Sequence, residues 1–454
     1  MDSIREPARD IPVVEDVDVL VLGGGCTGVF AALRAARLGA KVAIVEQNNA
    51  FGGTAANGFV CIWHELTDTT YKKQIISGLT EEVLDRLGRV PNGLRQRIAP
   101  EGSPFRAPYY SRYHLNTEEL KIELDSMILD AGITPYLHTK YAAPFIRDGR
   151  LEAVVIENRS GRSAIRAKFF VDATADGFLG ADCGMETYYH DAHFQPATTG
   201  ARVWGWNQLQ DPNTVLRSEE NRLRIGGRAG WELPMTGAEE ISTWCKSQFV
   251  GDCSDAKVLT RAEISGRAQV REMMNILRET DTHGKELSLV ALSSIIGIRE
   301  TRQLKCTYQL KTDDVCYGRA FDDAIGYCAY PVDVHVPQIP TTFRYLDGTE
   351  QHGLPGGGVE WVRWRTDEGP YPTYWQIPYR CMLPGKIDNL LICGRAIDTE
   401  KGAFGAARVM ISLNQTGEAA GVACYEALSS GRTVQSIDIA ALRRRMKDGG
   451  SIIL

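Results

Sequence analysis

The sequence predicts an α/β fold, and two observations support this prediction. Near the N-terminus, an apolar stretch at 17–22 leads directly into the glycine-rich turn Gly23 to Gly28, then into a helical stretch and a second apolar stretch at 41–45. Near the C-terminus, an apolar stretch at 387–393 also ends at a glycine and precedes a long helical stretch. Apolar strands that alternate with helices are typical of a parallel sheet covered by helices.

The first glycine-rich turn has the spacing of a dinucleotide-binding βαβ unit of the Rossmann type. Gly23 permits the tight turn, Gly25 lets the backbone approach a pyrophosphate, and Gly28 lets the helix pack against the strand. The N-terminus of that helix offers N–H groups and the positive end of its dipole to the anion. Glu46 ends the next strand, where a carboxylate accepts hydrogen bonds from ribose hydroxyls. The expected contacts in this part also include Cys26, Thr27 and Gln47.

A second glycine-rich loop, Phe51 to Gly58, follows directly after the acidic residue. A unit that binds only NAD has no general need for such a loop, whereas an extended flavin needs flexible backbone along its pyrophosphate and ribityl arm. We therefore expect FAD as the cofactor, with Gly52, Gly53 and Thr54 among its contacts.

Charge and composition exclude several other classes of protein. The net charge of −6 and the pI near 5.9 give no basic surface for nucleic acid or for an anionic membrane. The longest apolar run, near 287–298, is about a dozen residues and too short for a membrane span. The first ten residues lack the apolar core of a signal peptide, and the eleven cysteines have no metal-ligand spacing. We expect a soluble, cytoplasmic protein with reduced thiols and no metal.

Two later segments are expected to complete the flavin sheet. Residues 166–172 form an apolar strand that leads into the small-residue turn 173–177, and residues 387–398 form another. The small-residue helix that follows Met410 can pack closely on the cofactor or the sheet, and its N-terminus can face the pyrimidine carbonyls of a flavin, where negative charge develops on reduction. A plain packing helix is the alternative.

Together these motifs resemble those of the large family of FAD-dependent oxidoreductases, whose members carry GGGxxG and GGT loops, a DATGDG turn and a C-terminal DNLLxxGR…RVM segment. Two positions depart from the pattern of that family: Ala175 replaces a usual glycine, and Glu418 stands in GEAAG where GQAAG is common. The matching segments are GGGCTG (23–28), FGGTAANG (51–58), DATADG (172–177), GIRETR (297–302), YPVDVH (330–335), DNLLICGRAID (388–398) and ARVM (407–410).

The resemblance implies a Rossmann-type FAD-binding domain assembled from two separated segments, 13–185 and 385–434. It also implies an inserted α+β substrate domain at 186–384. Residues 60–114 are rich in Arg, Pro and Gly, and we expect them to form an irregular excursion that covers the site. Residues 435–454 are expected to form a C-terminal tail.

The resemblance also implies roles for single residues. Glu46 is expected at the adenine ribose and Asp398 at the ribityl region. Further cofactor contacts are expected at Ala173, Thr174, Gly394, Arg395, Arg408, Val409 and Met410.

The inserted part offers residues for chemistry. Asp333 and His335 alternate along an extended segment and therefore share one face of a strand. A carboxylate beside an imidazole suits an orienting group and a general base that removes a hydroxyl or amine proton, although a structural pair has the same pattern. Arg299 and Arg302 lie in the GIRETR segment, a loop or helix that the resemblance places against the flavin. They suit a reduced flavin or a substrate carboxylate, or else an Arg–Glu ion pair that braces the domains.

Three histidines are weaker candidates for the substrate pocket: His64, His190 and His193. His190 and His193 are spaced to share a helix face, but no third ligand has suitable spacing, so no metal is expected there.

The sequence therefore predicts an FAD-dependent oxidoreductase whose flavin accepts a hydride from a small organic substrate, as in a dehydrogenase or oxidase. The electron acceptor stays open among oxygen, NAD(P) and a redox partner, and the oligomeric state is undetermined. A flavin monooxygenase or reductase is the alternative enzyme. A non-catalytic or regulatory FAD-binding protein is the alternative from another class.

Overall fold

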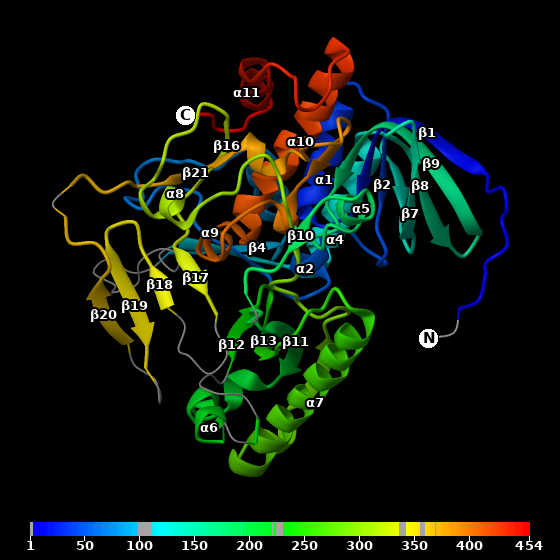
Figure 1. Cartoon of the computed structure of the whole chain (residues 1–454). Coiled ribbons are helices and arrows are strands. Elements are labelled where there is room, and N and C mark those ends of the chain that lie inside the picture. Colours follow the sequence, from blue (N-terminus) through cyan, green and yellow to red (C-terminus); the bar gives the residue numbers. More distant parts are fainter. Residues whose placement is uncertain are drawn as a thin grey trace.

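A seven-stranded sheet forms the framework of the N-terminal part in the computed structural model (Figure 1). Its order is β6-β2-β1-β9-β8-β7, and β22 also pairs with β9. β6, β2, β1, β9 and β22 run parallel, whereas β8 and β7 are antiparallel additions. The strands are β1 (Val13–Leu22), β2 (Val42–Val45), β6 (Thr134–Tyr136), β7 (Lys140–Arg147), β8 (Arg150–Asn158), β9 (Gly161–Asp172) and β22 (Leu390–Ile392).

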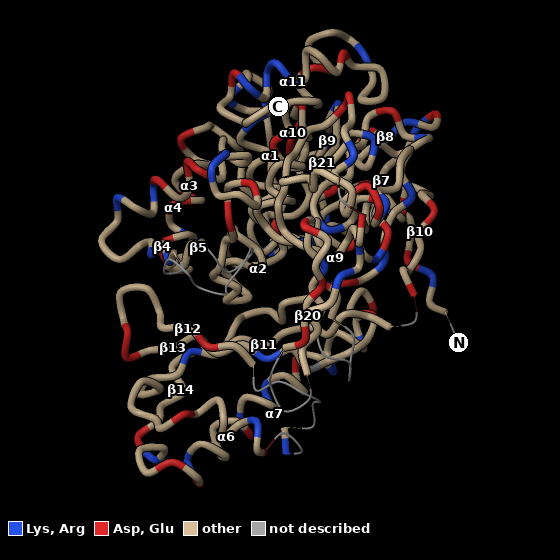
Figure 2. The backbone as a smooth tube through the Cα atoms, turned by 90° about the vertical axis from the view of Figure 1, so that its left-hand side faces the viewer, with Lys and Arg blue, Asp and Glu red and all other residues tan. Residues whose placement is uncertain are grey.

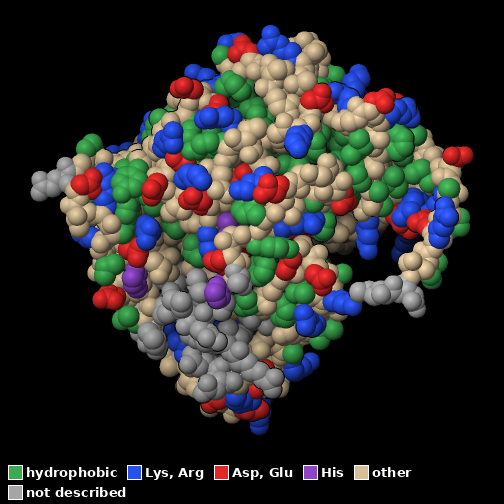
Figure 3. All heavy atoms as spheres, in the orientation of Figure 1, with side chains coloured by type: hydrophobic (Ala, Val, Ile, Leu, Met, Phe, Trp, Pro, Cys, Tyr) green, Lys and Arg blue, Asp and Glu red, His purple; other side chains and the backbone are tan. Residues whose placement is uncertain are grey.

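The structure describes residues 3–98, 111–191, 193–219, 222–223, 230–335, 342–354, 359–367 and 369–454, without the side chain of residue 248. Within these residues, the α/β class and the Rossmann-type unit predicted from the sequence are confirmed. The face shown in Figure 3 carries Lys and Arg side chains interspersed with Asp and Glu.

Alternating residues of the central strands feed two hydrophobic clusters. Val19 and Val21 of β1 face the helices, whereas Leu20 and Leu22 face the opposite side of the sheet. The first cluster contains α1 (Cys26–Arg37), α4 (Thr117–Asp130) and α10 (Met410–Ser430), and the second contains α5 (Phe178–Asp182).

The helices α1 and α10 pack in close contact (Figure 1). A Cβ atom on Gly417 would overlap the carbonyl oxygen of Thr27, and one on Gly421 would overlap that of Ala31. Close packing by this small-residue helix was expected against the cofactor or the sheet. The structure shows that Gly417 and Gly421 instead make it possible against α1, so that a helix from the end of the chain is fixed beside the first glycine-rich turn.

The excursion at 60–114 is more regular than the sequence predicts. Its described residues form α3 (Leu79–Arg89) and a three-stranded antiparallel sheet, whose order is β3-β5-β4. The prediction of an irregular segment is therefore wrong for these residues, because paired strands and an amphipathic helix satisfy their backbone hydrogen-bonding groups. Residues 99–110 lie outside the described chain. The strands are β3 (Ile62–Trp63), β4 (Leu94–Ile98) and β5 (Ser111–Leu115).

The middle of the chain contributes an antiparallel sheet of order β12-β13-β11-β14, packed on α7 (Ala256–Thr280) and α6 (Pro212–Ser218). In Figure 2 this group lies below the body that holds α1 and α10. Its strands are β11 (Ala197–Trp204), β12 (Trp231–Met235), β13 (Ala238–Phe249) and β14 (Ser288–Leu292).

A second antiparallel sheet has the order β17-β18-β19-β20, and two pairs of short strands, β16 with β21 and β10 with β15, complete the fold. The strands are β17 (Val332–Val334), β18 (Thr342–Arg344), β19 (Thr349–Gly353), β20 (Val359–Arg363), β16 (Ala324–Cys328), β21 (Trp375–Pro378), β10 (Thr187–Tyr188) and β15 (Gln303–Leu304). The remaining helices are α2 (Gly53–Ala56), α8 (Thr312–Cys316), α9 (Lys401–Ala407) and α11 (Ile439–Asp448), with short 3-10 turns at Trp206–Gln208, Gly284–Glu286, Tyr379–Met382 and Gly394–Ala396.

Packing crosses the expected domain limits. Tyr327, Trp375 and Tyr379 belong to the same hydrophobic cluster as α1 and α10. The last residues pack there too, because α11 contacts α10 and the carbonyl oxygen of Leu454 accepts a hydrogen bond from the Tyr327 hydroxyl.

Candidate active site

Four parallel strands end at the same level of the sheet. In the strand register Leu22 pairs with both Val45 and Asp172, and Asp172 also pairs with Ile392. The residues that follow these strand ends therefore meet at one edge, although they come from positions far apart in the sequence. Ligands of open α/β sheets bind at this carboxyl edge.

The first turn has the shape that a pyrophosphate requires. Gly23 has a φ of 102°, and Cβ atoms on Gly23 and Gly28 would overlap the carbonyl oxygens of Ala173 and Gly23. Gly25 differs, because a Cβ there would have no atom within 4 Å. The two outer glycines thus serve the fold, whereas Gly25 borders open space into which a phosphate fits.

The carboxylate of Glu46 is buried at the end of β2. It accepts hydrogen bonds from the backbone N–H groups of Gly24 at 2.7 Å and Asn48 at 2.8 Å, and from the Asn48 side chain at 2.6 Å. These bonds hold the carboxylate beside the glycine turn. The contact of Glu46 with a ribose remains a prediction, and so does a cofactor contact of Gln47, which is exposed.

The second glycine-rich loop lies directly against the first. Gly52 forms a parallel bridge with Gly25 and donates its N–H to the carbonyl oxygen of Gly24 at 2.8 Å. Gly52 and Gly53 have φ values of 100° and 50°, which glycine adopts at little cost. The buried Cys26 thiol points at the carbonyl oxygen of Gly52, and burial raises the pKa of that thiol to about 12. The thiol is therefore a neutral connection between the loops.

The DATADG turn after β9 ties the sheet to the C-terminal segment. The buried Asp172 carboxylate accepts from the backbone N–H groups of Thr174 at 3.1 Å and Gly180 at 2.9 Å. Ala175 has a φ of 68°, in the region that explains why relatives place glycine there. Asp176 pairs with Arg395 at 2.7 Å.

Many predicted cofactor contacts are partly exposed, although the segments that carry them are otherwise largely buried. These positions leave accessible atoms at the carboxyl edge of the sheet. The partly exposed positions are Gly23, Gly25, Thr27, Gly53, Thr54, Ala173, Thr174, Arg395, Arg408 and Met410.

The GIRETR segment is an extended chain, not a helix. Gly297 exchanges backbone hydrogen bonds with Thr198 of β11, so the segment follows that strand. Arg302 donates to the carbonyl oxygen of Asp176 at 2.8 Å and lies over the Phe178 ring. Among the described residues, neither Arg299 nor Arg302 has a carboxylate at ion-pair distance.

In place of the alternative Arg–Glu ion pair, the structure has a histidine–glutamate pair in this segment. The ring of His190 is buried, with Nδ1 2.7 Å from Oε1 of Glu300 and Nε2 2.9 Å from the carbonyl oxygen of Thr399. Both ring nitrogens face acceptors, so His190 connects the GIRETR segment to the segment after Asp398. Its place in a substrate pocket remains a prediction. The His193 ring is 71% exposed in a chain without helical structure, which rules out a shared helix face.

Asp398 is buried beneath the same segment. Its carboxylate accepts from the Tyr188 hydroxyl at 2.7 Å and from the backbone N–H of Cys306 at 2.8 Å. Burial raises the pKa of this carboxyl. Both oxygens are thus engaged within the protein, and a contact with the ribityl arm remains a prediction.

A compact group of polar side chains surrounds β17. Nε2 of His335 lies 3.2 Å from Oδ1 of Asp333, and Nη2 of Arg408 lies 2.9 Å from Oδ2. The Tyr330 hydroxyl donates to Oδ2 at 3.2 Å, and the Tyr330 ring lies 4.9 Å from that of His64. The predicted Asp333–His335 pair therefore exists, and an arginine predicted for the cofactor joins it.

A glycine explains how two distant segments meet here. A Cβ on Gly405 would lie 2.7 Å from the carbonyl oxygen of Asp333, so only glycine lets α9 approach β17 this closely. Arg408 ends α9, and α10 begins two residues later. The geometry thus puts the polar group beside the N-terminus of α10.

Burial and neighbouring charges set the protonation of the pair. Burial lowers the pKa of His335 to about 4, with help from Arg299 and Arg408 against the opposing effect of Asp333. Burial raises the pKa of Asp333, but His335, Arg408 and Arg299 outweigh it and hold that pKa well below its usual range. At neutral pH the carboxyl is ionised and the imidazole is neutral.

A family comparison identifies the chain. The family described as FAD dependent oxidoreductase matches residues 18–446. The chain belongs to this family. FAD is therefore its cofactor, and the glycine turns at the sheet edge fit that group.

Individual relatives of this FAD-dependent oxidoreductase match shorter parts. A dihydrolipoyl dehydrogenase of Trypanosoma brucei brucei is 49% identical over 49 residues, which are 11% of this chain and 10% of that protein. A thiamine thiazole synthase of Thermococcus kodakarensis is 26% identical over 173 residues, 36% of this chain and 58% of that protein. The chain thus spans between a tenth and three-fifths of the length of these relatives.

Solved structures match the chain at low sequence identity. A geranylgeranyl bacteriochlorophyll reductase-like protein from Thermoplasma acidophilum has a TM-score of 0.47 and 12% identity, over 95% of this chain and 83% of that one.

No described helix is long and apolar enough to cross a bilayer.

Two residues of the polar group were not predicted from the sequence. Tyr330 begins the YPVDVH motif, and its place three residues before Asp333 was an available signal. The side chain of Gln195 accepts the backbone N–H of His335 at 3.1 Å, and no local pattern indicates a contact between residues so far apart.

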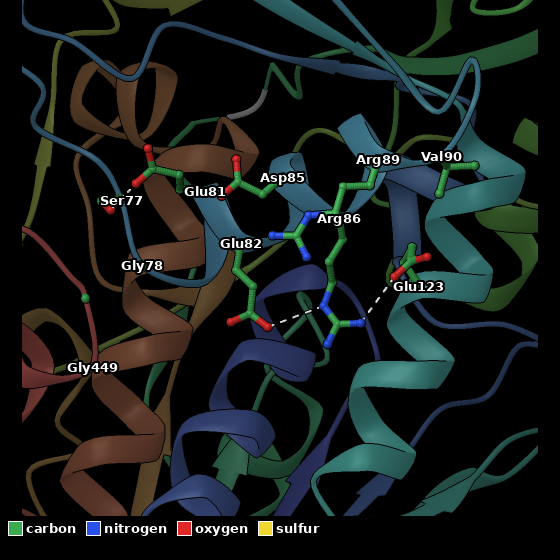
Figure 4. A pocket seen from close by; sticks show the side chains of 11 residues that line it. Ser77, Gly78, Glu81, Glu82, Asp85, Arg86, Arg89, Val90, Glu123 and Gly449 are labelled. Atoms are coloured by element: carbon green, nitrogen blue, oxygen red, sulfur yellow. Dashed lines mark hydrogen bonds and ion pairs between the residues drawn. The ribbon is translucent and has the colours of Figure 1, made fainter.

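A groove of about 610 Å³ lies elsewhere on the molecule and contains none of the predicted site residues. It is lined by α3, Glu123 of α4 and Gly449–Gly450, and Arg86 points between Glu82 and Glu123 across it (Figure 4). Arg86 forms ion pairs with both glutamates, at 3.4 Å and 3.3 Å.

Proposed function

We propose that this FAD-dependent oxidoreductase oxidises a small organic molecule that bears a hydroxyl or amine, and that His335 accepts the proton. The observation that carries the proposal is the Asp333–His335 pair, 3.2 Å apart and held beside the N-terminus of α10. When bound, FAD supplies the oxidant by accepting the substrate C–H hydrogen and its electron pair as a hydride, while the O–H or N–H proton passes to His335 and a C=O or C=N bond forms.

Asp333 positions the base. Its ionised carboxylate faces Nε2 of His335 and favours the tautomer in which Nε2 carries the hydrogen. Nδ1 then has the lone pair and is the ring atom that takes the proton. The same carboxylate stabilises the imidazolium that results, so the pair has the chemistry of a general base and its orienting group.

Three further contacts fix Asp333. Arg408 donates to both its side chain and its carbonyl oxygen, and Tyr330 donates to Oδ2. A carboxylate held by these donors cannot rotate away from the imidazole. Arg408 also connects the base to the first turn of α10, whose dipole favours negative charge nearby.

The test is anaerobic reduction of the purified holoenzyme. A panel of small alcohols, amines, hydroxy acids and amino acids is mixed with the protein, and the visible flavin band is followed. We expect a member of the panel to bleach it, and readmission of oxygen, NAD(P) or a redox protein to identify the acceptor.

Variants link the reaction to the base. We expect His335→Gln to slow reduction about 100-fold or more, the usual contribution of a general base. Asp333→Asn is expected to slow it as well while FAD stays bound. His283→Gln, at an exposed histidine, is the matched control. Reduction of His335→Gln at the rate of the unmodified protein would disprove the role of the base.

A further inference from the structure

We infer that the substrate of this site carries a carboxylate and that Arg299 binds it. The inference rests on the proposed function and adds the class of substrate. It concerns small carboxylic acids that also bear the hydroxyl or amine to be oxidised.

The guanidinium of Arg299 is anchored at one corner only. Its Nη1 donates to the carbonyl oxygen of Pro196 at 2.6 Å, to Oγ1 of Thr198 at 2.6 Å and to Oγ of Ser247 at 2.7 Å. All three acceptors are neutral and belong to or adjoin β11 and β13. Nε and Nη2 make no hydrogen bond with any residue in the described ranges. An arginine held in this way presents one edge of its planar fork to a carboxylate.

The charge of the site is unbalanced. Within the described part of the chain, Arg299 has no carboxylate at ion-pair distance, and the nearby Asp333 is already paired with Arg408. Burial lowers the pKa of Arg299 to about 10, and Arg408 adds to this effect while Asp333 opposes it. A largely buried cation without an anion is costly. A ligand with one negative charge would offset that cost.

The same arginine acts on the base. Arg299 is among the charges that lower the pKa of His335, so the two side chains lie within electrostatic range of each other. Both are partly exposed. A carboxylate on Arg299 therefore lies near the proton acceptor, as a small hydroxy or amino acid requires.

Two other roles for Arg299 predict different results. If it only braces β11 against β13, the charge of a ligand is irrelevant. If it only stabilises reduced flavin, its loss changes the reduction potential of the flavin and leaves the binding of anions intact.

The experiment is a titration of the oxidised holoenzyme with matched pairs of probes. Acetate, glycolate, succinate and benzoate are each compared with the neutral amide, by flavin difference spectra and by calorimetry. We expect at least one carboxylate to bind about tenfold or more tightly than its amide, the equivalent of one charge-assisted hydrogen bond. Because no turnover is needed, this result is independent of the hydride-transfer proposal.

Variants assign the effect to Arg299. Arg299→Gln is expected to weaken the binding of that carboxylate about 10- to 100-fold and to leave the binding of its amide unchanged. Arg299→Lys keeps the positive charge but lacks the planar fork. Its affinity for the carboxylate is expected to lie between that of the unmodified protein and that of Arg299→Gln. Arg217→Gln removes an exposed positive charge and serves as the control.

The proposal is overturned if no carboxylate of the series binds more tightly than its amide. It is also overturned if Arg299→Gln binds the carboxylate normally, with or without a changed reduction potential. Should Arg299→Gln fail to fold, the probe pairs on the unmodified protein and the Lys variant still decide the question.

Discussion

Arg34 of α1 and Glu418 of α10 form a buried ion pair, with Nε of Arg34 2.8 Å from Oε2 of Glu418. Their side chains are 6% and 1% exposed. Glu418 also accepts from the backbone N–H of Leu79 and from the Ser451 hydroxyl, and Arg34 donates to the carbonyl oxygen of Gly449 at 2.5 Å. The pair explains why this chain has glutamate where its family commonly has glutamine.

We expect Glu418→Gln to lower the free energy of unfolding by about 3 kcal/mol, because it leaves a buried guanidinium without its anion. Urea unfolding of the holoprotein measures the change. The double variant Arg34→Met with Glu418→Gln removes both charges and should recover part of the loss. Glu82→Gln is the control, since it breaks a half-exposed pair with Arg37 and should cost less than about 1 kcal/mol. Equal losses at both sites would contradict this account.

Different glycines of the first turn are expected to affect FAD binding and stability. Gly25 has φ −63° and ψ 167° and open space beyond its Cα, so we expect Gly25→Ala to change the free energy of unfolding of the apoprotein by less than about 1 kcal/mol. The new methyl group would stand where the pyrophosphate approaches, and FAD affinity should fall at least about tenfold. Gly28→Ala should instead destabilise the apoprotein by about 1–3 kcal/mol. If Gly25→Ala still bound FAD tightly, the placement of the pyrophosphate beside Gly25 would be wrong.

The packing of α10 on α1 predicts an effect at a distance. Gly417→Ala would push the helix against the carbonyl oxygen of Thr27, so both stability and FAD affinity should fall. Gly88 of α3 is an exposed helical glycine with no close neighbour, and Gly88→Ala should stabilise the protein by roughly 0.5–1 kcal/mol. Unfolding curves and FAD titrations of the two variants test this contrast, which fails if Gly417→Ala binds FAD normally.

The rate of flavin reduction should depend on pH through His335. The pKa of His335 is about 4, and only the neutral ring accepts a proton, so kcat/KM should be level near neutral pH and fall about tenfold per unit below pH 4. Arg299 lowers that pKa, so Arg299→Gln should move the acid limb to higher pH. If the pH at which kcat/KM falls were unchanged in Arg299→Gln, the assignment of this pH dependence to His335 would be contradicted.

Stability must be followed in the same pH series. The unfolded chain protonates His335 near its ordinary pKa of 6.5, whereas the folded chain does so near 4. Below about pH 6.5 the unfolded state thus binds more protons, and this group makes the folded state less stable as the pH falls. Circular dichroism at each pH separates unfolding from loss of the base.

Local patterns were sufficient for the elements of the flavin sheet. The spacing from Gly23 to Gly28, the strand that ends at Glu46 and the loop at Gly52 each reflect steric demands between neighbours in the chain, which explains why they were predicted correctly. The pairing of Asp333 with His335 was predicted from their period-two spacing for the same reason. The prediction of an irregular excursion was wrong and the GIRETR segment stayed open between a loop and a helix, because the extended pairing of β5 and of Gly297 depends on partners that are remote in sequence.

The sequence by itself determined the glycine-rich turns and the alternation of Asp333 and His335, since both follow from backbone sterics over a few residues. Only the tertiary structure decided which side chains surround that pair. Arg408 reaches Asp333 because Gly405 lets α9 pack on β17, and His190 connects two segments because Glu300 and Thr399 fold onto its two nitrogens. Burial, together with the neighbouring arginines, then lowers the pKa of His335, and burial is a property of the packed chain rather than of any segment of its sequence.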